Sequence, residues 1–282
     1  MIDILQDIDG AIVSIDPFTS RVFDGAPRLK VVARTGVGYD AIDVSAATAR
    51  GIAVCTTPGT NRHAVAEYTI ALMLVCSRKM LQNLLEVAKG GWDRYAGIDL
   101  AGKTLGIIGL GTIGKEVAQR MRAFEMRILA YDVAQDQQFA EAYQVSYVPL
   151  EELLRESDFV TIHSFLDARS HHLIDAERLA LMKPTAYLIN TARGGIVDTE
   201  ALCEALMQKR IAGAALDVFE GEPLAADSPL RRLDNVYLSP HAAGSTVDAR
   251  RVGGMMAAEN VIRLLRGERP LSILNPEVLE RR

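Results

Sequence analysis

Cysteine is scarce in this sequence, which has three cysteines among 282 residues. Cys55, Cys76 and Cys203 are scattered and odd in number, and no spacing among them fits a metal site. This pattern argues against a disulfide framework and favours reduced thiols in a cytoplasmic protein. A long apolar segment is also lacking, because the stretch 64–76 contains Glu67 and is too short to span a bilayer. No membrane association is therefore expected, and the acidic residues at the start of the chain argue against a signal peptide.

The sequence has no excess of basic residues either. Lys and Arg together number 31 against 36 Asp and Glu, and the formal net charge of −5 argues against a nucleic-acid partner. Long repeats and low-complexity tracts are absent. A hydrophobic content of 49% and a charged content of 24% are typical of a globular protein, and 282 residues are enough for two domains.

Short apolar, β-branched runs alternate with helical patterns along the whole chain, which predicts an α/β fold with parallel strands. The expected strands are 11–15, 29–33, 52–54, 104–108, 127–131, 159–163, 186–190, 213–217 and 236–238. The expected helices are 19–25, 43–50, 64–80, 135–143, 150–155, 199–209 and 246–265, with the end of another at 179–182. The turn-forming residues 56–59 interrupt the pattern and mark a candidate hinge.

A glycine-rich turn follows the strand expected at 104–108. Gly109, Gly111 and Gly114 have the G-x-G-x-x-G spacing, and an amphipathic helix begins among them. Such glycines permit a tight turn, the approach of a pyrophosphate to the backbone, and close packing of helix and strand. Asp132 ends the next strand, where it would bind the ribose hydroxyls and repel a 2′-phosphate. The order of these parts predicts a dinucleotide site that favours NAD over NADP.

Three polar residues follow later strands, and the carboxyl ends of parallel strands share one crevice. Arg193, Glu222 and His241 are suited to binding a carboxylate, orienting an imidazole and moving a proton. Taken singly, each has an alternative role, as a surface arginine, part of a solvated acidic loop, or a residue that caps a loop. Together, beside a nicotinamide site, they predict a hydride-transfer set. His163 is expected beside the cofactor, and the pair 171–172 at the surface.

Six segments carry a resemblance to a known family: RTGVGYDAID, PGTNRHAVAEYTIALML, GLGTIG, NTARGGIVD, LDVFEGEP and SPHAAGST. They resemble, in order, motifs of the D-isomer-specific 2-hydroxyacid dehydrogenases, and most closely the phosphoglycerate dehydrogenase-like branch. The resemblance implies a doubly wound Rossmann domain for NAD, expected over 56–242. It also implies a smaller flavodoxin-like α/β substrate domain, expected over 1–55 and 243–282. A homodimer formed through the larger domain is a further implication.

The resemblance also implies a role for each matching residue. Arg193 would hold the substrate carboxylate and polarise its carbonyl, and His241 would be the general acid for reduction and the base for oxidation. Glu222 would be the partner of that histidine, leaving Glu220 without a role, and Asp217 would contact the nicotinamide carboxamide. Backbone groups expected to line the cofactor belong to Thr112, Ile113, Ser164 and Thr191. Amides expected to bind the substrate carboxylate belong to Val37 and Gly38.

The sequence departs from the family pattern at several places. Family members usually have another strand and helix before the segment equivalent to 9–13, so this smaller domain is expected to be shortened, with an uncovered strand edge. The stretch 163–167 replaces the usual His-x-Pro-Leu-Thr, and Glu125 stands where glycine is common. Phosphoglycerate enzymes usually carry a basic residue near the segment 12–18, which here has none. That difference argues against phosphoglycerate as the substrate.

The prediction is an NAD-dependent oxidoreductase acting on C2 of a small D-2-hydroxy or 2-keto acid. One alternative is an NAD-responsive, non-enzymatic interaction protein, because a corepressor group related to the family keeps its fold and cofactor. Another is a catalytically impaired, truncated homologue. A formate dehydrogenase is disfavoured because that branch resembles a glutamine at the position of Glu222.

Overall fold

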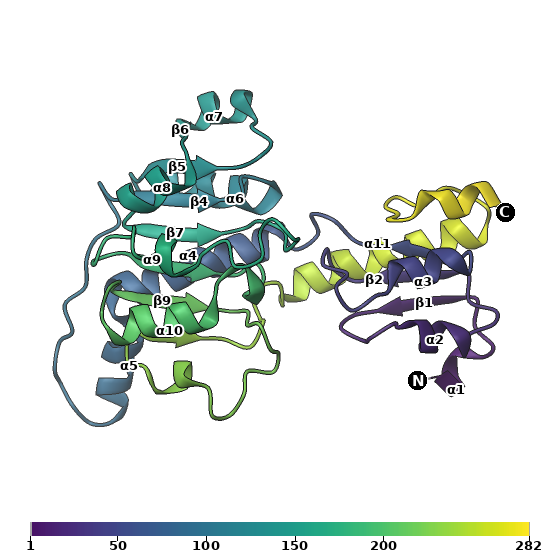
Figure 1. Ribbon diagram of the computed structural model, residues 1–282, viewed down its shortest axis with the longest axis horizontal. Helices are drawn as coiled ribbons and strands as arrows, with labels where there is room; N and C mark the ends of the chain where they lie inside the picture. The colour runs from purple at the N-terminus through teal and green to yellow at the C-terminus, as the bar shows by residue number, and fades with distance from the viewer. Residues whose placement is uncertain (1, 282) are drawn as a thin grey trace. The chain divides into compact units, whose positions relative to one another are not determined.

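The computed structural model describes residues 2–281, and the chain divides into two compact units (Figure 1). One unit comprises residues 1–61 and 245–282, and the other comprises residues 62–244. These divisions lie a few residues from the boundaries expected at 55/56 and 242/243. Each unit has its own parallel sheet.

The unit of residues 62–244 is built on seven parallel strands in the order β10-β9-β8-β7-β4-β5-β6. The strands are β4 (Thr104–Ile108), β5 (Arg127–Tyr131), β6 (Val145–Tyr147), β7 (Phe159–Ile162), β8 (Tyr187–Asn190), β9 (Gly213–Leu216) and β10 (Val236–Leu238). The chain runs outward from β4 through β5 to β6 and then returns to β7 on the other side of β4. This reversal places a crevice beyond the carboxyl ends of β4 and β7.

Helices cover both faces of this sheet (Figure 1). The helices are α4 (Arg62–Arg78), α5 (Met80–Ala88), α6 (Thr112–Arg122), α7 (Gln137–Tyr143), α8 (Leu150–Glu156), α9 (Ala176–Leu179) and α10 (Thr199–Met207), with 3-10 turns η1 (Gly194–Ile196) and η2 (Pro229–Arg232). Apolar side chains of α4, α6 and α7 pack on one face, and those of α8, α9 and α10 pack on the other. All five residues of β4 are buried, as expected for a strand covered on both faces. The predicted doubly wound α/β fold is confirmed.

The other unit contains a three-stranded parallel sheet in the order β1-β2-β3. Its elements are α1 (Ile2–Leu5), β1 (Gly10–Val13), α2 (Ser20–Asp24), β2 (Val31–Arg34), α3 (Val44–Ala49), β3 (Ala53–Cys55), α11 (Val247–Leu265) and the 3-10 turn η3 (Pro276–Arg281). Helices α2 and α3 pack on one face, and α11 and η3 pack on the other. Strand β1 is an edge strand, and its Ile12 is half exposed.

Most predicted elements are present within one to three residues of their expected bounds, and β4, β5 and β10 match them in full. Asp43 caps α3 as predicted, with its carboxylate accepting from the backbone N–H of Ala46. Glu125 has a φ of +59°, a left-handed conformation that explains why glycine suits this position. The sequence-based interpretation missed α1, α5 and β6.

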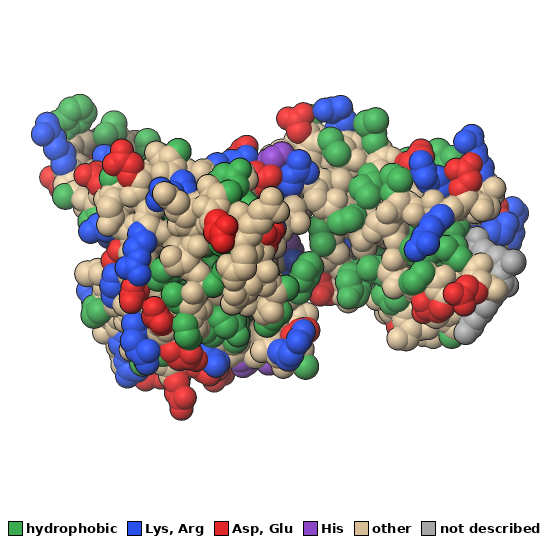
Figure 2. All heavy atoms as spheres, turned by 90° about the horizontal axis from the view of Figure 1, so that it is seen from above, with side chains coloured by type: hydrophobic (Ala, Val, Ile, Leu, Met, Phe, Trp, Pro, Cys, Tyr) green, Lys and Arg blue, Asp and Glu red, His purple; other side chains and the backbone are tan. Residues whose placement is uncertain are grey.

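The surface carries charges of both signs. On the face shown in Figure 2, basic and acidic side chains are interspersed, with apolar side chains between them. Among residues 2–281, no helix combines the length and the apolar character that a membrane-crossing helix requires.

Candidate active site

The turn between β4 and α6 is shaped by its glycines. Gly109 has a φ of +92°, and a Cβ there would lie 2.7 Å from the backbone nitrogen of Ser164. A Cβ on Gly114 would lie 2.2 Å from the carbonyl oxygen of Gly109. Around Gly111, by contrast, a Cβ would meet no described atom within 4 Å. The turn therefore has tight packing at its first and third glycines and open space at the second, where the dinucleotide motif needs it.

The start of α6 leaves donors available at this open space. Gly111 occupies the N-cap position without a side-chain capping bond, and Thr112 and Ile113 are the first residues of the helix. Their unpaired N–H groups and the helix dipole favour an anion at this place. Asp132 follows β5 and accepts hydrogen bonds from the backbone N–H groups of Leu110 (2.7 Å) and Ala134 (2.9 Å). Its carboxylate is thus tied to the glycine-rich turn.

Polar groups after β7 and β8 border the same turn. The Oγ of Ser164 is buried and has no hydrogen-bond partner among the described residues, which fits a site completed by a ligand. The two ring nitrogens of His163 are also buried and unpartnered, and burial lowers the pKa of this histidine to about 3. The hydroxyl of Thr191 lies 2.9 Å from that of Thr69 on α4. The residues present therefore fit a bound dinucleotide.

Arg193 lies in the loop after β8, and Asn190 holds this loop in place. The Asn190 side chain accepts from the N–H of Ala192 (3.0 Å) and donates to the carbonyl of Arg193 (2.8 Å). Gly194 follows, and a Cβ there would lie 1.9 Å from the carbonyl carbon of Phe219. Any larger residue at 194 would push the two loops apart. The loop of Arg193 therefore lies against the loop that carries Glu222.

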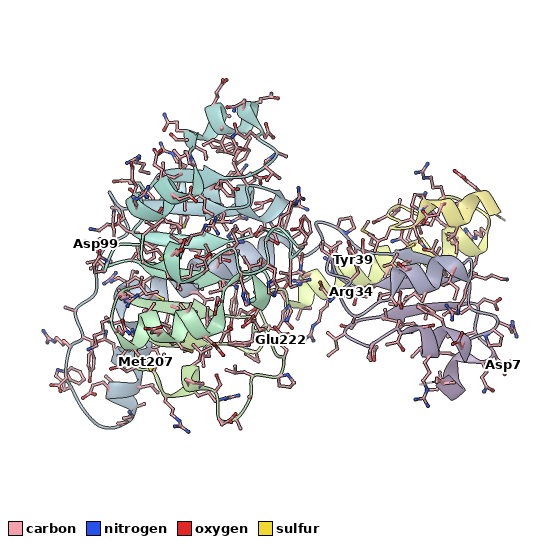
Figure 3. All side chains as sticks on the ribbon, viewed as in Figure 1. Asp7, Arg34, Tyr39, Asp99, Met207 and Glu222 are labelled. Carbon is pink, nitrogen blue, oxygen red and sulfur yellow. The ribbon has the colours of Figure 1, made fainter. Side chains whose placement is uncertain are left out.

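Glu222 and His241 form a direct pair. The Nδ1 of His241 lies 2.7 Å from Oε2 of Glu222, while Oε1 accepts from the backbone N–H of Phe219 at 3.1 Å. Both side chains are accessible to a small molecule, with 46% and 38% of their surfaces exposed. Figure 3 shows Glu222 at the carboxyl-end side of the sheet, opposite Asp99, which precedes β4. The structure thus brings together two residues that are 19 positions apart in sequence.

Asp217 supports the loop of His241. It is fully buried after β9 and accepts from the hydroxyl of Ser239 (2.6 Å) and from the N–H groups of Ala242 (2.9 Å) and Ala243 (2.8 Å). His241 itself has a φ of +51° and donates its N–H to the carbonyl of Asp217. Asp217 therefore holds the left-handed turn that presents the imidazole. A contact of Asp217 with a nicotinamide carboxamide stays a prediction.

Val37 and Gly38 belong to the other unit, in the loop that follows β2. Arg34 and Tyr39 flank them and lie at the carboxyl-end side of the small sheet (Figure 3). The adjacent Gly36 has a φ of +155°, and the side chain of Arg34 covers it closely. The part of Val37 and Gly38 in binding a substrate carboxylate stays a prediction.

Sequence reasoning missed the supporting role of Asn190 and the pairing of Glu220 with His172 beside the site. Asn190 reads as the end of an apolar strand, and only the structure shows its amide bridging the loop of Arg193. Glu220 was assigned no role, yet one of its oxygens lies 2.5 Å from Nε2 of His172, which was assigned to the surface. The two glutamates of Phe-Glu-Gly-Glu indicate an acidic loop, but the sequence does not show which histidine each glutamate contacts.

The arrangement combines a phosphate-binding turn with a proton-transfer pair. The glycine turn, the α6 N-terminus and Asp132 offer donors for phosphates and an acceptor for hydroxyls. Because His241 uses Nδ1 to contact Glu222, its Nε2 is left to exchange a proton with a ligand. A guanidinium on the neighbouring loop supplies a positive charge for a carboxylate. This is chemistry suited to an oxidation or reduction at a carbon that bears oxygen.

Comparisons with known proteins agree with this chemistry. Residues 70–243 match the sequence model described as D-isomer specific 2-hydroxyacid dehydrogenase, NAD binding domain. A glyoxylate reductase of Korarchaeum cryptofilum is 45% identical, and the match covers 99% of this chain and 86% of that protein. A D-3-phosphoglycerate dehydrogenase of Methanocaldococcus jannaschii is 43% identical, over 98% of this chain and 53% of that protein. An acyclic imino acid reductase, solved with NADPH and D-Arg, superposes with a TM-score of 0.87 at 32% identity, over 97% of this chain and 87% of that one.

Proposed function

The chain belongs to the D-isomer specific 2-hydroxyacid dehydrogenase family, and from this premise we propose that it interconverts a small D-2-hydroxy acid and its 2-keto acid. The family assignment makes it an oxidoreductase that uses NAD(P) and acts on 2-hydroxy acids. The observation that carries the finer proposal is the 2.7 Å pairing of His241 with Glu222, whose loop adjoins the loop of Arg193.

In this proposal each residue has one task. Arg193 binds the substrate carboxylate and stabilises negative charge on the C2 oxygen. Glu222 accepts the hydrogen bond from Nδ1–H of His241, which keeps Nε2 directed at the substrate. Asp217 and Asn190 act as positioning residues for the loops of His241 and Arg193. The amides of Val37 and Gly38 complete carboxylate binding.

Reduction of the keto acid needs one hydride and one proton, and they come from different groups. When bound, the reduced nicotinamide supplies a hydride to C2 of the keto acid. His241 gives the proton from Nε2 to the carbonyl oxygen, so that the product is the neutral alcohol of a 2-hydroxy acid. In the oxidation, Nε2 takes that proton back from the hydroxyl group.

Asp132 favours NAD over NADP in this proposal. Its carboxylate faces the glycine turn and would oppose a 2′-phosphate by charge repulsion. The related imino acid reductase was solved with NADPH, and a direct measurement tests the preference of this chain. Replacing Asp132 with asparagine should shift the NADH to NADPH ratio of kcat/KM toward NADPH by about fivefold or more.

We infer that the substrate is a small keto acid of the glyoxylate and hydroxypyruvate class. The match covers 86% of the glyoxylate reductase but only 53% of the phosphoglycerate dehydrogenase. The segment 12–18 contains no Lys or Arg and includes Asp16, so it offers no partner for a substrate phosphate. A phosphorylated keto acid is therefore the weaker candidate.

The test is a substrate panel: glyoxylate, hydroxypyruvate, phosphohydroxypyruvate and bulkier keto acids, each assayed with NADH and with NADPH by loss of reduced cofactor. We expect turnover with a small keto acid, and a loss of about 10² to 10³ in kcat/KM for Arg193→Ala. Arg127→Ala is the matched control, because that exposed arginine pairs with Glu156 away from the site. Tight NADH binding without turnover on any acid would favour a non-enzymatic, NAD-responsive protein, and near-normal turnover of Arg193→Ala would refute the assignment of Arg193.

We also propose a homodimer formed through the unit of residues 62–244. Helix α5 has no buried residue, and its exposed apolar side chains are Met80, Leu81, Leu84, Leu85 and Val87. An unburied face of this kind marks an interaction surface. Leu84→Asp should give a monomer by light scattering, whereas Met207→Asp, at an equally exposed apolar position on α10, should leave the mass unchanged. A monomeric parent protein would rule the dimer out.

A cytoplasmic location is the remaining part of the proposal. The three cysteines are buried and unpaired, and burial raises the pKa of Cys55 and Cys76 to about 12. Such thiols stay protonated and unreactive, as is usual in a reducing compartment. Fractionation of the native host, with detection by antibody, would test this location.

A further inference from the structure

A second group of histidine and carboxylate side chains lies in the unit of residues 62–244, outside the Arg193, Glu222 and His241 set. It consists of His171, His172 and Glu220, whose potential ligand atoms all lie within 4.8 Å of one another. The two imidazole rings stack with centroids 4.0 Å apart, and Glu220 approaches His172 from a separate loop. The proposed reaction uses none of these three side chains.

The backbone fixes both sides of this cluster. His171 donates its N–H to the carbonyl of Asp167 (2.9 Å), and His172 donates to the carbonyl of Gly195 (2.8 Å). Glu220 accepts at its second oxygen from the N–H of Thr199, which begins α10. The ligand atoms therefore converge from segments that are held by main-chain hydrogen bonds, so little ordering is needed to bind an ion.

The donor set is one that transition metals prefer. Two imidazoles and one carboxylate suit Zn²⁺, Co²⁺, Ni²⁺ or Cu²⁺, with water completing the coordination. His172 faces Glu220 with Nε2, and its Nδ1 lies 3.8 Å from Oδ2 of Asp198. A carboxylate behind a coordinating imidazole is the usual arrangement that fixes the tautomer and raises ligand basicity. The ring nitrogens of His171 make no hydrogen bond within residues 2–281, so they are available to an ion.

We propose that His171, His172 and Glu220 bind one divalent transition-metal ion, with Asp198 as the outer carboxylate. The ion would replace the proton between Nε2 of His172 and Oε1 of Glu220, now 2.5 Å apart. Metal–nitrogen and metal–oxygen bonds of about 2.0 to 2.2 Å require these atoms to separate slightly. Both side chains are about one-third exposed, which leaves room for that adjustment.

A bound ion would join two loops that border the candidate active site. His172 is bonded to Gly195, two residues after Arg193, and Glu220 precedes Glu222 by two residues. The ion would thus act as a cross-link that limits opening of the 219–222 loop. The site itself does not depend on the proposed reaction, because its donors and their spacing are independent of what binds beside His241.

Protons compete with the metal at this site. Metal affinity should therefore weaken as the pH falls, because each coordinating imidazole must be neutral.

The experiment measures binding of Zn²⁺ and Co²⁺ alone to tag-free, EDTA-treated protein by calorimetry and by the visible absorption of Co²⁺. We expect one ion per chain, at least tenfold weaker binding in His171→Ala, His172→Ala and Glu220→Gln, and about tenfold weaker binding in Asp198→Asn. His63→Ala is the matched control, because His63 is another exposed histidine near a carboxylate, 3.3 Å from Glu116. That variant should bind like the parent protein.

Three results of the binding experiment would contradict the metal site. Absence of saturable binding in the parent protein, or equal affinity in the parent and the three ligand variants, overturns the proposal. A Co²⁺ spectrum with thiolate charge-transfer bands would place the ion on cysteine and also overturn it. Should His172→Ala fail to fold, the near-isosteric Glu220→Gln and the exposed His171→Ala decide the question. A failed dehydrogenase assay leaves these binding results unaffected.

Discussion

Two glutamates on one short loop each contact a histidine from another part of the chain. Comparing the two pairs shows what distinguishes a proton-transfer group from a structural pair. Glu220 contacts His172 at 2.5 Å, and Glu222 contacts His241 at 2.7 Å. Both histidines have left-handed backbone conformations, with φ values of +49° and +51°. Distance to a carboxylate and backbone conformation therefore do not separate the two.

The difference lies in the other nitrogen of each ring. His172 contacts Glu220 through Nε2, and its Nδ1 lies 3.8 Å from the carboxylate of Asp198. His241 contacts Glu222 through Nδ1, and its Nε2 makes no hydrogen bond in the described part of the chain. An imidazole between two carboxylates is suited to carrying a positive charge or a metal. An imidazole with one free nitrogen is suited to exchanging a proton with a substrate.

The largest expected effect is the loss of the His241 imidazole. His241→Ala should lower kcat for keto-acid reduction by about 10² to 10⁴, because it removes the group that we propose delivers the proton. Removing the other imidazole, in His172→Ala assayed with EDTA, should cost far less than this range. Steady-state kinetics under one set of conditions gives both numbers. Equal losses of kcat in the two variants would contradict the assignment of proton transfer to His241.

The next effect concerns the two carboxylates. In Glu222→Gln the side-chain amide would donate to Nδ1 of His241, forcing the neutral ring to carry its proton on Nε2. That tautomer cannot accept the proton of the substrate hydroxyl, and the imidazolium that donates the proton in reduction loses its carboxylate partner, so kcat should fall by about 10²-fold in both directions. Glu220→Gln is the control, two residues away on the same loop. An equal loss in Glu220→Gln would count against the assignment.

A smaller effect on kcat and stability should follow from weakening the hydrogen bonds by which Asp217 supports the loop of His241. Asp217→Asn would turn an amide donor toward the N–H of Ala242 or of Ala243, leaving a buried donor without an acceptor. We expect a stability loss of about 1 to 3 kcal/mol in denaturant unfolding and a lower kcat with little change in KM for NADH. A raised KM for NADH with full kcat would show that Asp217 contacts the cofactor instead of positioning the loop.

The parts of the fold and of the site that depend on local sequence were predictable, whereas those that depend on contacts between distant residues were not. The glycines at 109, 111 and 114 and the acid at 132 were placed by their order along the chain, because a strand, a turn and a helix in sequence dictate their geometry. The fold class followed from the alternation of apolar runs. Helix α5 was missed because the helix expected over 64–80 ends where α5 begins, and the apolar side chains of α5 are exposed and belong to no core cluster.

The pairing of carboxylates with histidines was only partly predictable. That Glu222 would face His241 came from the family resemblance and not from spacing. His172 and Glu220 are 48 residues apart, and their meeting depends on how the loop after β7 bonds to Gly195 and the loop after β9 packs on Gly194. Asn190 was overlooked because one amide at the end of an apolar strand has no sequence signature. Packing of loops decides these contacts, and loops are where sequence patterns carry least information.

The smallest effect is a pH dependence of stability that belongs to the His172 pair alone. The hydrogen bond that His172 donates to Glu220 raises the pKa of His172, so its stabilisation is complete below about 6.5 and is lost as the pH rises through the raised value. Burial raises the pKa of Glu220, but hydrogen bonds from Thr199 and His172 outweigh it and hold that pKa below its usual range, so this contribution is lost as the pH falls below about 4.5. The pair is therefore most stabilising between these limits.

His172→Gln should consequently be less stable than the parent near pH 5.5 and should approach it near pH 8.5. The difference should stay below about 1 kcal/mol, because both groups are about one-third exposed and solvent screens them. Unfolding in urea with EDTA present, at both pH values, measures it. Lys115→Gln, which removes a surface pair with Asp136, should show no such change over this range, because no histidine is involved. If His172→Gln lost more stability relative to the parent at pH 8.5 than at pH 5.5, the charge of His172 would not stabilise its pair with Glu220. Geometry alone would then distinguish His172 from His241.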